Sequence, residues 1–222
     1  MEKRKIVFGT YDTAAAGWTL TGWRLSDPVQ KTKYLDKMGG DGSWDLSTAL
    51  TEGLMRYKDR QLTASFESSE GDRKARESII RQMVNQLDGA RLDIVLPDDP
   101  DHYVTGRVSV QRVYSDLAHA AVTVTVVCEP WRYSNTEKAI TLTAATSEKT
   151  ATLANNGRRA VVPLLTVTGS SASVRLSYGT ASASFGAGEH KWPDLLLTPG
   201  SHALKYSGSG AIKITYREAV LE

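Results

Sequence analysis

The sequence has 222 residues, of which 23% are charged and 41% hydrophobic, and its formal net charge at pH 7 is +2. These are the values of a globular chain of one or two domains, and they exclude a disordered, collagen-like or coiled-coil protein. The charge surplus is too small for a nucleic-acid binder, one cysteine excludes an internal disulfide, and no apolar run approaches the roughly 18–20 residues that span a membrane. We therefore expect a soluble, cytoplasmically made protein with no membrane segment and no nucleic-acid binding.

The first part of the chain combines strands with one helix. Apolar and polar residues alternate near residues 18–23, 62–67, 104–110 and 122–128, and the last two runs, separated by a turn at 114–117, are expected to form an antiparallel pair. Between 72 and 88 the apolar residues recur three and four positions apart, which predicts an amphipathic helix. Ser69 and Asp72 offer side-chain oxygens that can cap its start, and Gly89 can end it. A helix with one apolar face has to lie on a sheet, so this part is expected to be an α+β domain.

The composition changes near Ser134. Residues 136–222 contain 13 Ala, 11 Thr and 10 Ser, and glycines and prolines divide them into about eight short alternating strands. Turns at intervals of 8–12 residues are typical of a β-sandwich. The sequence therefore predicts a mainly β protein of two domains, 1–134 with a helix at about 72–88, and 135–222 as a β-sandwich.

Residue patterns for catalysis are missing from the sequence. The four histidines are scattered singly, so no metal site is expected, and Cys128 on an alternating apolar strand is interpreted as a core thiol. Asp98, Asp99 and Asp101 are interpreted as a solvated turn, with a calcium or magnesium loop as the alternative. We assign no catalytic, cofactor-binding or metal-ligating residue, and we expect no cofactor and no enzyme activity.

A glycine-rich loop at residues 36–45 is the first candidate site. It lacks the Lys-Ser/Thr of a phosphate-binding loop and the ligand spacing of an EF-hand. Exposed Met and Trp side chains beside glycines suit a protein contact. The predicted interface residues are Lys37, Met38, Gly40, Asp41 and Trp44, and the alternative interpretation is a plain hairpin.

Aromatic residues of the second domain form the other candidate. Trp192, Tyr178 and Tyr206 could offer a platform on which a sugar ring stacks, whereas the alternative is that they belong to the core.

Several stretches resemble the distal tail protein (Dit) family of long-tailed, siphophage-type phages and their prophages. They are Ile6–Thr13, Trp18–Trp23, Lys33–Ser47, Tyr57–Thr63 with the helix after it, and Thr215–Leu221. Two positions depart from the family pattern, because Met38-Gly39 stands where the family has Pro-Gly and Ala219 stands where glycine is common.

The resemblance implies a virion structural protein at the tail tip, made in the bacterial host cytoplasm. It implies that the first domain assembles into a homo-hexameric hub ring. Such a ring would join the tail tube protein to the tail-associated fibre or lysin tip protein. The second domain, a galectin-like or carbohydrate-module-like sandwich, would project outward toward a receptor-binding protein or a cell-surface glycan. The alternative function is a carbohydrate-binding or adhesion module that acts through residues 135–222.

Overall fold

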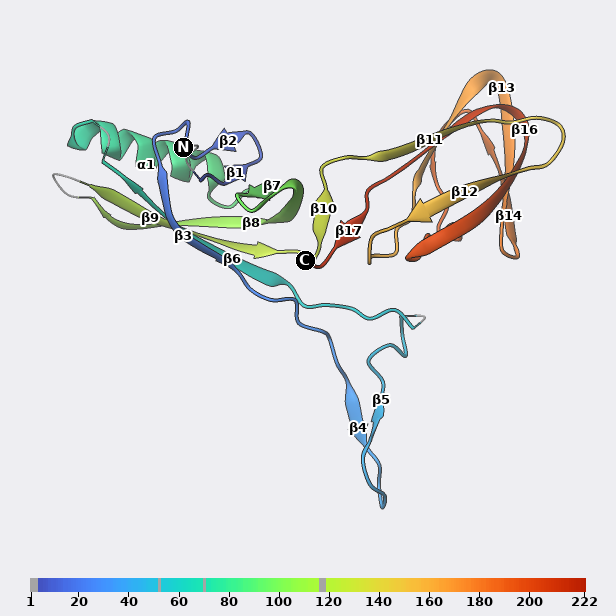
Figure 1. The fold of residues 1–222 in the computed structure, drawn as a ribbon, viewed down its shortest axis with the longest axis horizontal. Helices are drawn as coiled ribbons and strands as arrows, with labels where there is room; N and C mark the ends of the chain where they lie inside the picture. Colours follow the sequence, from blue (N-terminus) through green and yellow to red (C-terminus); the bar gives the residue numbers. More distant parts are fainter. Residues whose placement is uncertain (1–3, 52, 70, 116–118) are drawn as a thin grey trace. The chain divides into compact units, whose positions relative to one another are not determined.

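The computed structural model describes residues 4–51, 53–69, 71–115 and 119–222. The chain divides into two compact units, unit 1 (Met1–Pro130) and unit 2 (Trp131–Glu222), which are drawn as one ribbon in Figure 1. Strands predominate in both units and unit 1 carries the helix, which confirms the prediction of a mainly β protein.

Unit 1 is built on an antiparallel sheet with the strand order β2-β1-β7-β8-β9-β6-β3. Its strands are β1 (Val7–Phe8), β2 (Tyr11–Asp12), β3 (Thr19–Leu25), β6 (Arg60–Ser68), β7 (Arg91–Leu96), β8 (Asp99–Ser115) and β9 (Ala120–Cys128). The expected antiparallel pair is confirmed as β8 and β9, with Val108 opposite Val126. Of the turn expected at 114–117, residues 116 and 117 lie outside the described residues.

One face of this sheet forms the core of unit 1. Because side chains alternate between the two faces of a strand, Leu62, Ala64 and Phe66 of β6 point to the same side, and all three are fully buried. The intervening Thr63 and Ser65 lie on the opposite face, which is partly open to solvent.

Helix α1 (Arg73–Leu87) covers the core face. The Asp72 carboxylate caps it by accepting a hydrogen bond of 2.8 Å from the Ala75 N–H, and Ile80, Met83 and Leu87 are its buried stripe against β8 and β9. The helix ends before Gly89, whose φ is 75°. The predicted helix is therefore confirmed to within a residue at each end.

Between β3 and β6 the chain leaves the sheet and forms a separate hairpin, β4 (Tyr34–Asp36) and β5 (Ser43–Asp45), drawn in blue in Figure 1.

Unit 2 is a sheet whose two longest strands are β13 (Leu164–Tyr178) and β16 (Gly200–Tyr216). The first part of β13 and the last part of β16 pair with β15 (Gly188–Lys191) and β11 (Lys138–Thr143), whereas their other parts pair with β14 (Ala181–Gly186) and β12 (Lys149–Asn155). Buried residues of both parts, such as Leu165 and Leu176, belong to one core. The short strands β10 (Arg132–Ser134) and β17 (Ala219–Val220) pair with each other.

The expectation of only short strands in this unit was wrong. Residues 164–167 and 174–178 belong to one strand, and so do 202–206 and 211–216. The glycines between them make an irregularity in the pairing rather than a turn, since Gly208 and Gly210 have φ values of 120° and 101° within β16. Glycine in a strand can mark a bulge as well as a break, which the sequence pattern does not distinguish.

Candidate assembly interface

The predicted interface residues all lie in the β4–β5 hairpin. With the segments that lead to and from it, the hairpin forms a projection between β3 and β6, which we call the projection (residues 29–58). Tyr34 pairs with Asp45, Leu35 with Trp44 and Asp36 with Ser43. Directly opposed residues share a face, and faces alternate along a strand. Leu35 and Trp44 therefore form one face of the hairpin.

The loop of the hairpin is closed by backbone hydrogen bonds. The Lys37 N–H donates to the Gly42 carbonyl at 3.2 Å and the Gly40 N–H to the Lys37 carbonyl at 3.4 Å. Gly39 and Gly42 have φ values of 73° and 77°, in the left-handed region that glycine adopts without strain. The sequence therefore favours a tight connection here.

Two carboxylates on the face opposite Leu35 are held in place. Asp36 accepts a hydrogen bond of 2.8 Å from the Ser43 hydroxyl, and Asp45 accepts one of 2.9 Å from the Ser47 N–H. Hydrogen bonds from the Ser47 side chain and backbone hold the pKa of Asp45 below its ordinary value. This face therefore carries two carboxylates whose positions are held by hydrogen bonds.

At the base of the hairpin, backbone hydrogen bonds join the segment that leads into β4 to the segment that follows β5. The Lys31 N–H donates to the Arg56 carbonyl, and the Lys58 N–H to the Val29 carbonyl, both at 2.8 Å. Nearer the sheet, the buried Arg60 donates through Nε to the Ser26 carbonyl at 2.6 Å. These bonds hold the two chain segments at the base of the hairpin against each other.

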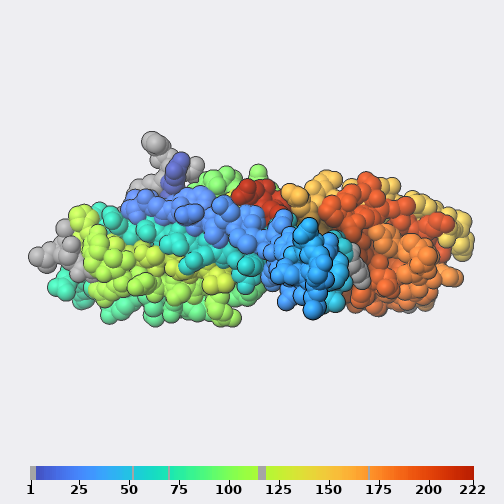
Figure 2. All heavy atoms as spheres, turned by 90° about the horizontal axis from the view of Figure 1, so that it is seen from below, coloured from blue at the N-terminus to red at the C-terminus, as the bar shows by residue number. Residues whose placement is uncertain are grey.

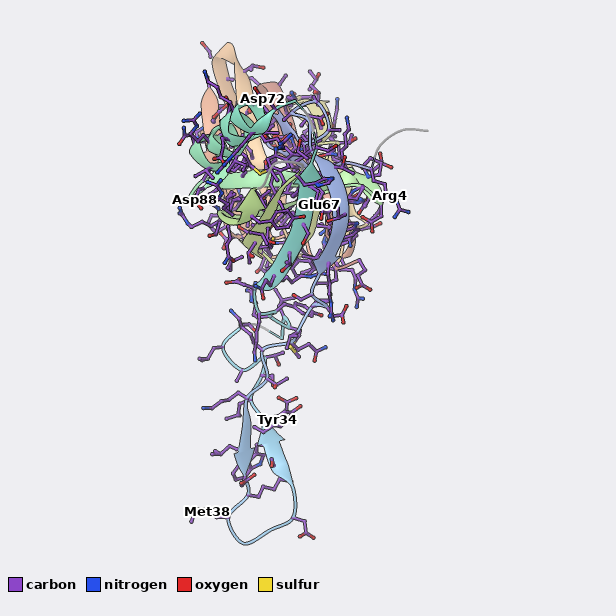
Figure 3. The ribbon with its side chains drawn as sticks, turned by 90° about the vertical axis from the view of Figure 1, so that its left-hand side faces the viewer. Arg4, Tyr34, Met38, Glu67, Asp72 and Asp88 are labelled. Atoms are coloured by element: carbon purple, nitrogen blue, oxygen red, sulfur yellow. The ribbon has the colours of Figure 1, made fainter. Side chains whose placement is uncertain are left out.

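Exposed apolar side chains are concentrated on this projection. Of the ten large hydrophobic residues that are exposed in the described part of the chain, seven lie between residues 29 and 50, namely Val29, Tyr34, Leu35, Met38, Trp44, Leu46 and Leu50. Met38 is 99% exposed and Trp44 53%, and Figure 3 shows Tyr34 on the hairpin and Met38 at its tip. A concentration of exposed apolar side chains in one segment is a common feature of interaction sites.

The structure thus brings the five predicted residues together in one hairpin. Gly40 and Asp41 lie in its loop, Trp44 lies in β5, and all are exposed. Sequence reasoning missed Tyr34, Leu35 and Leu46, because an apolar residue in a short strand is as compatible with a core as with a surface. The signal that could have found them is the pairing of residues 34–36 with 43–45 across the loop.

The three aromatic residues of unit 2 have a different environment. Trp192 and Tyr206 belong to the core and expose only 6% and 9% of their surface, and Tyr178 is half-buried. Trp192 donates through its indole N–H to Asp194 at 2.8 Å, and the Tyr178 hydroxyl lies 2.7 Å from Nδ1 of His202. Two of the three rings therefore offer little surface on which a sugar could stack.

The groups considered for chemistry lie apart from the hairpin. Cys128 is buried in the core of unit 1, and burial raises the pKa of its thiol to about 12. His102 contacts Asp99 at 2.8 Å, and the described residues contain no group of three or more His, Cys, Asp or Glu that could hold a metal ion. Within the described residues, no helix is long and apolar enough to cross a membrane.

Comparison with known proteins was informative only at the level of structure, since neither a protein-family model nor a curated protein matches the sequence. The crystal structure of the phage SPP1 Dit (gp 19.1) protein, described as a paradigm of the hub adsorption apparatus in phages that infect Gram-positive bacteria, has a TM-score of 0.67 at 14% identity. The similarity covers 97% of this chain and 99% of that one. A chain of the phage P2 baseplate, in its activated conformation with Ca, has a TM-score of 0.50 at 9% identity. That similarity covers 97% of this chain and 98% of the baseplate chain.

The similarity extends over both units, so this chain has the fold of a phage distal tail protein. Among solved structures, the SPP1 Dit protein shows this fold over 99% of its chain.

Proposed function

We propose that this protein is a structural component of the tail tip of a long-tailed phage or prophage. Six copies form a hub ring through unit 1, and the ring joins the tail tube protein to the fibre or lysin protein of the tip. Unit 2 projects outward from the ring. The similarity to SPP1 Dit over 97% of this chain and 99% of that one supports this proposal. The protein then belongs to the virion and performs no catalytic step.

The observation that carries the proposal is the hairpin with its exposed apolar residues. A two-stranded hairpin is at best marginally stable in water, and β4 and β5 bury none of their six residues. The apolar side chains of this projection would become buried if another protein surface covered them. A subunit that extends such a projection toward a different surface of its neighbour makes a head-to-tail contact. Head-to-tail contacts close into a ring when the rotation from each copy to the next returns to the first copy.

The mass of the purified full-length chain tests the ring. We expect mass photometry to show a species of six times the 24.2 kDa chain mass, and negative-stain electron microscopy to show six-fold rings. The measurement is repeated with the tail tube protein of the same phage, which could nucleate the ring. If the chain stays at the monomer mass at high micromolar concentration in both mixtures, the proposed hub ring is ruled out.

A further inference from the structure

In unit 2, Asn156 directly precedes Gly157 in the turn that follows β12. An asparagine loses its side-chain amide when the backbone nitrogen of the next residue attacks its side-chain carbonyl carbon, and glycine hinders this attack least because it has no side chain. The other three asparagines, Asn85, Asn135 and Asn155, precede residues with side chains. Asn156 is also exposed, so it is the asparagine of this chain that the sequence marks as most reactive.

The reaction at Asn156 has two steps. The Gly157 amide gives its proton to a base in the solvent, its nitrogen bonds to Cγ of Asn156, and the side-chain amino group takes up a proton and leaves as ammonia. Water then adds to one of the two carbonyl groups of the resulting succinimide ring and breaks the adjacent C–N bond. The product is aspartate or isoaspartate, and in isoaspartate the backbone runs through the side chain and is one carbon longer.

In the folded chain the attacking nitrogen is bound to another group. The Gly157 N–H donates a hydrogen bond of 3.0 Å to Oδ1 of Asn155, which closes a turn through an asparagine side chain. Asn155 is 1% exposed, and its side-chain amide donates to the carbonyls of Arg159 at 2.8 Å and Leu197 at 2.9 Å. Gly157 is buried too, which hinders the approach of a base from solvent. Ring closure therefore has to break a buried hydrogen bond first.

Residues 217–221, which we call the closing segment, cover this turn. A Cβ atom on residue 157 would lie 2.7 Å from the carbonyl oxygen of Ala219 and 2.8 Å from its nitrogen, so the contact requires glycine at position 157. The Arg158 N–H donates to the same carbonyl at 2.8 Å. In Figure 2 the dark red atoms of the closing segment lie beside yellow-orange atoms of unit 2.

The carboxylate of Glu218, in the closing segment, binds the backbone of Asn156. It accepts a hydrogen bond of 2.5 Å from the Asn156 N–H and one of 2.6 Å from Nζ of Lys138 in β11. The Glu218 side chain is 17% exposed, so these bonds are largely shielded from water. The attack on Cγ requires the backbone of residue 156 to bring the two reacting atoms together. Because the N–H groups of Asn156 and Gly157 are both bound, this rearrangement is opposed.

The closing segment itself is held by a short pairing. Only Ala219 and Val220 form a strand, β17, which pairs with Tyr133 and Arg132 of β10 (Figure 1). Short elements near the end of a chain open more readily than the strands of a core. Release of the closing segment removes the Glu218 carboxylate from Asn156 and uncovers the turn.

We propose that Asn156 is a deamidation site that stays silent while the closing segment is docked and becomes reactive when the segment is released. The change is one-way for a geometric reason. Isoaspartate adds a backbone carbon next to Gly157, where the chain fits against Ala219 with no room for a methyl group. Both products also place a new carboxylate near that of Glu218. The segment then docks less well, so the site turns a transient opening of unit 2 into a permanent one.

The rate of deamidation in the native full-length chain tests this proposal without any substitution. The chain is kept in mildly alkaline buffer with and without guanidinium chloride, and peptide mapping by mass spectrometry measures the conversion of Asn156. We expect conversion to be at least about tenfold slower in the folded chain, because buried hydrogen bonds have to break first. Asn135, which precedes Thr136, is the internal reference and should convert slowly in both solutions. Equal rates at Asn156 in the two solutions would overturn the proposal.

Variants of the closing segment test its control over the site. We expect Glu218→Ala to raise the rate in the folded chain by about tenfold, because the Asn156 N–H loses its acceptor. Leu221→Ala, which shortens a buried apolar residue of the segment, loosens it in a second way and should act in the same direction. The matched control Glu189→Ala removes an exposed carboxylate of β15 and should leave the rate unchanged. If neither variant differs from this control while circular dichroism shows folded chains, the segment does not control the site and the proposal is wrong.

Hydrogen exchange tests whether the change is one-way. One sample of the chain is deamidated in guanidinium chloride and refolded, and a second is refolded at once. We expect the backbone amides of residues 217–221 to exchange faster in the deamidated sample. A chain with Asn156→Ser, treated in the same two ways, should show no difference. Equal exchange in the two native samples would mean that the segment docks equally well on the altered turn, which contradicts a one-way change.

Discussion

At Gly208 the backbone of β16 has a φ of 120°, and a Cβ atom there would lie 2.0 Å from the carbonyl oxygen of Ser173 in β13. The two strands can approach this closely only because residue 208 has no side chain. Gly210 is similar, since its Cβ would lie 2.7 Å from the Thr168 carbonyl oxygen. These two residues allow the longest strands of unit 2 to stay paired through their irregular middle.

Substitution at Gly208 is therefore expected to be costly. We expect Gly208→Ala to destabilise unit 2 by about 3 kcal/mol or more, since both the positive φ and the backbone contact oppose a methyl group. Gly179 has a φ of 58° with nothing within 4 Å of its Cβ, so Gly179→Ala should cost only about 1 kcal/mol. Urea unfolding of the two full-length variants, monitored by circular dichroism, measures the loss of unfolding free energy in each. Equal losses would show that the contact with Ser173 does not limit the packing.

At the scale of the element, helix α1 and the β4–β5 hairpin differ in whether their apolar side chains are buried within the chain. Helix α1 buries Ile80, Met83 and Leu87 against its own sheet, so its apolar face has a partner within the chain. The hairpin presents Leu35 and Trp44 to solvent. The helix therefore contributes to the stability of unit 1, whereas the hairpin leaves about half of the surface of Leu35 and Trp44 uncovered.

Truncation of Trp44 tests whether the hairpin serves association, as proposed, and not the stability of the chain. We expect Trp44→Ala to change the unfolding free energy of the chain by no more than about 0.5 kcal/mol, as for other surface substitutions. The same change should weaken self-association by about 2 kcal/mol, or roughly thirtyfold, because large aromatic side chains dominate interfaces. Thermal unfolding and sedimentation velocity provide the two measurements. Val113→Ala, which shortens another exposed apolar residue, is the control and should leave association unchanged.

At the scale of the whole molecule, the net charge of +2 presents little electrostatic opposition to assembly. In the proposed head-to-tail assembly, an open chain of subunits would leave one contact surface uncovered at each of its two ends. Closure covers both, so the ring gains one more contact than any open chain of the same size.

This closure predicts the distribution of species on dilution. We expect monomer and hexamer to dominate at every concentration, with few dimers to pentamers, because each intermediate lacks the closing contact. Mass photometry over a dilution series shows the distribution. A gradual series of open oligomers, or species that grow beyond six copies, would contradict a closed ring.

Local patterns in the sequence determined much of the fold. The apolar spacing within 72–88, with Asp72 before it and Gly89 after it, specified α1, and the alternation around Val108 and Val126 specified the β8–β9 pair. These features depend on residues close together in the chain or on a simple periodicity, so the sequence alone reveals them. The resemblance to distal tail proteins likewise rested on stretches spread along nearly the whole chain.

The tertiary structure decided which apolar residues are covered. In the sequence, Trp44 and Trp192 are both large aromatic residues beside small or polar neighbours, and one is 53% exposed whereas the other is 6% exposed. Burial depends on which distant segments come together, as does the continuity of β13 and β16 through their glycines. Composition, charge and the single cysteine thus limited what this protein can do from the start, but only the packing of the chain showed where its uncovered surface lies.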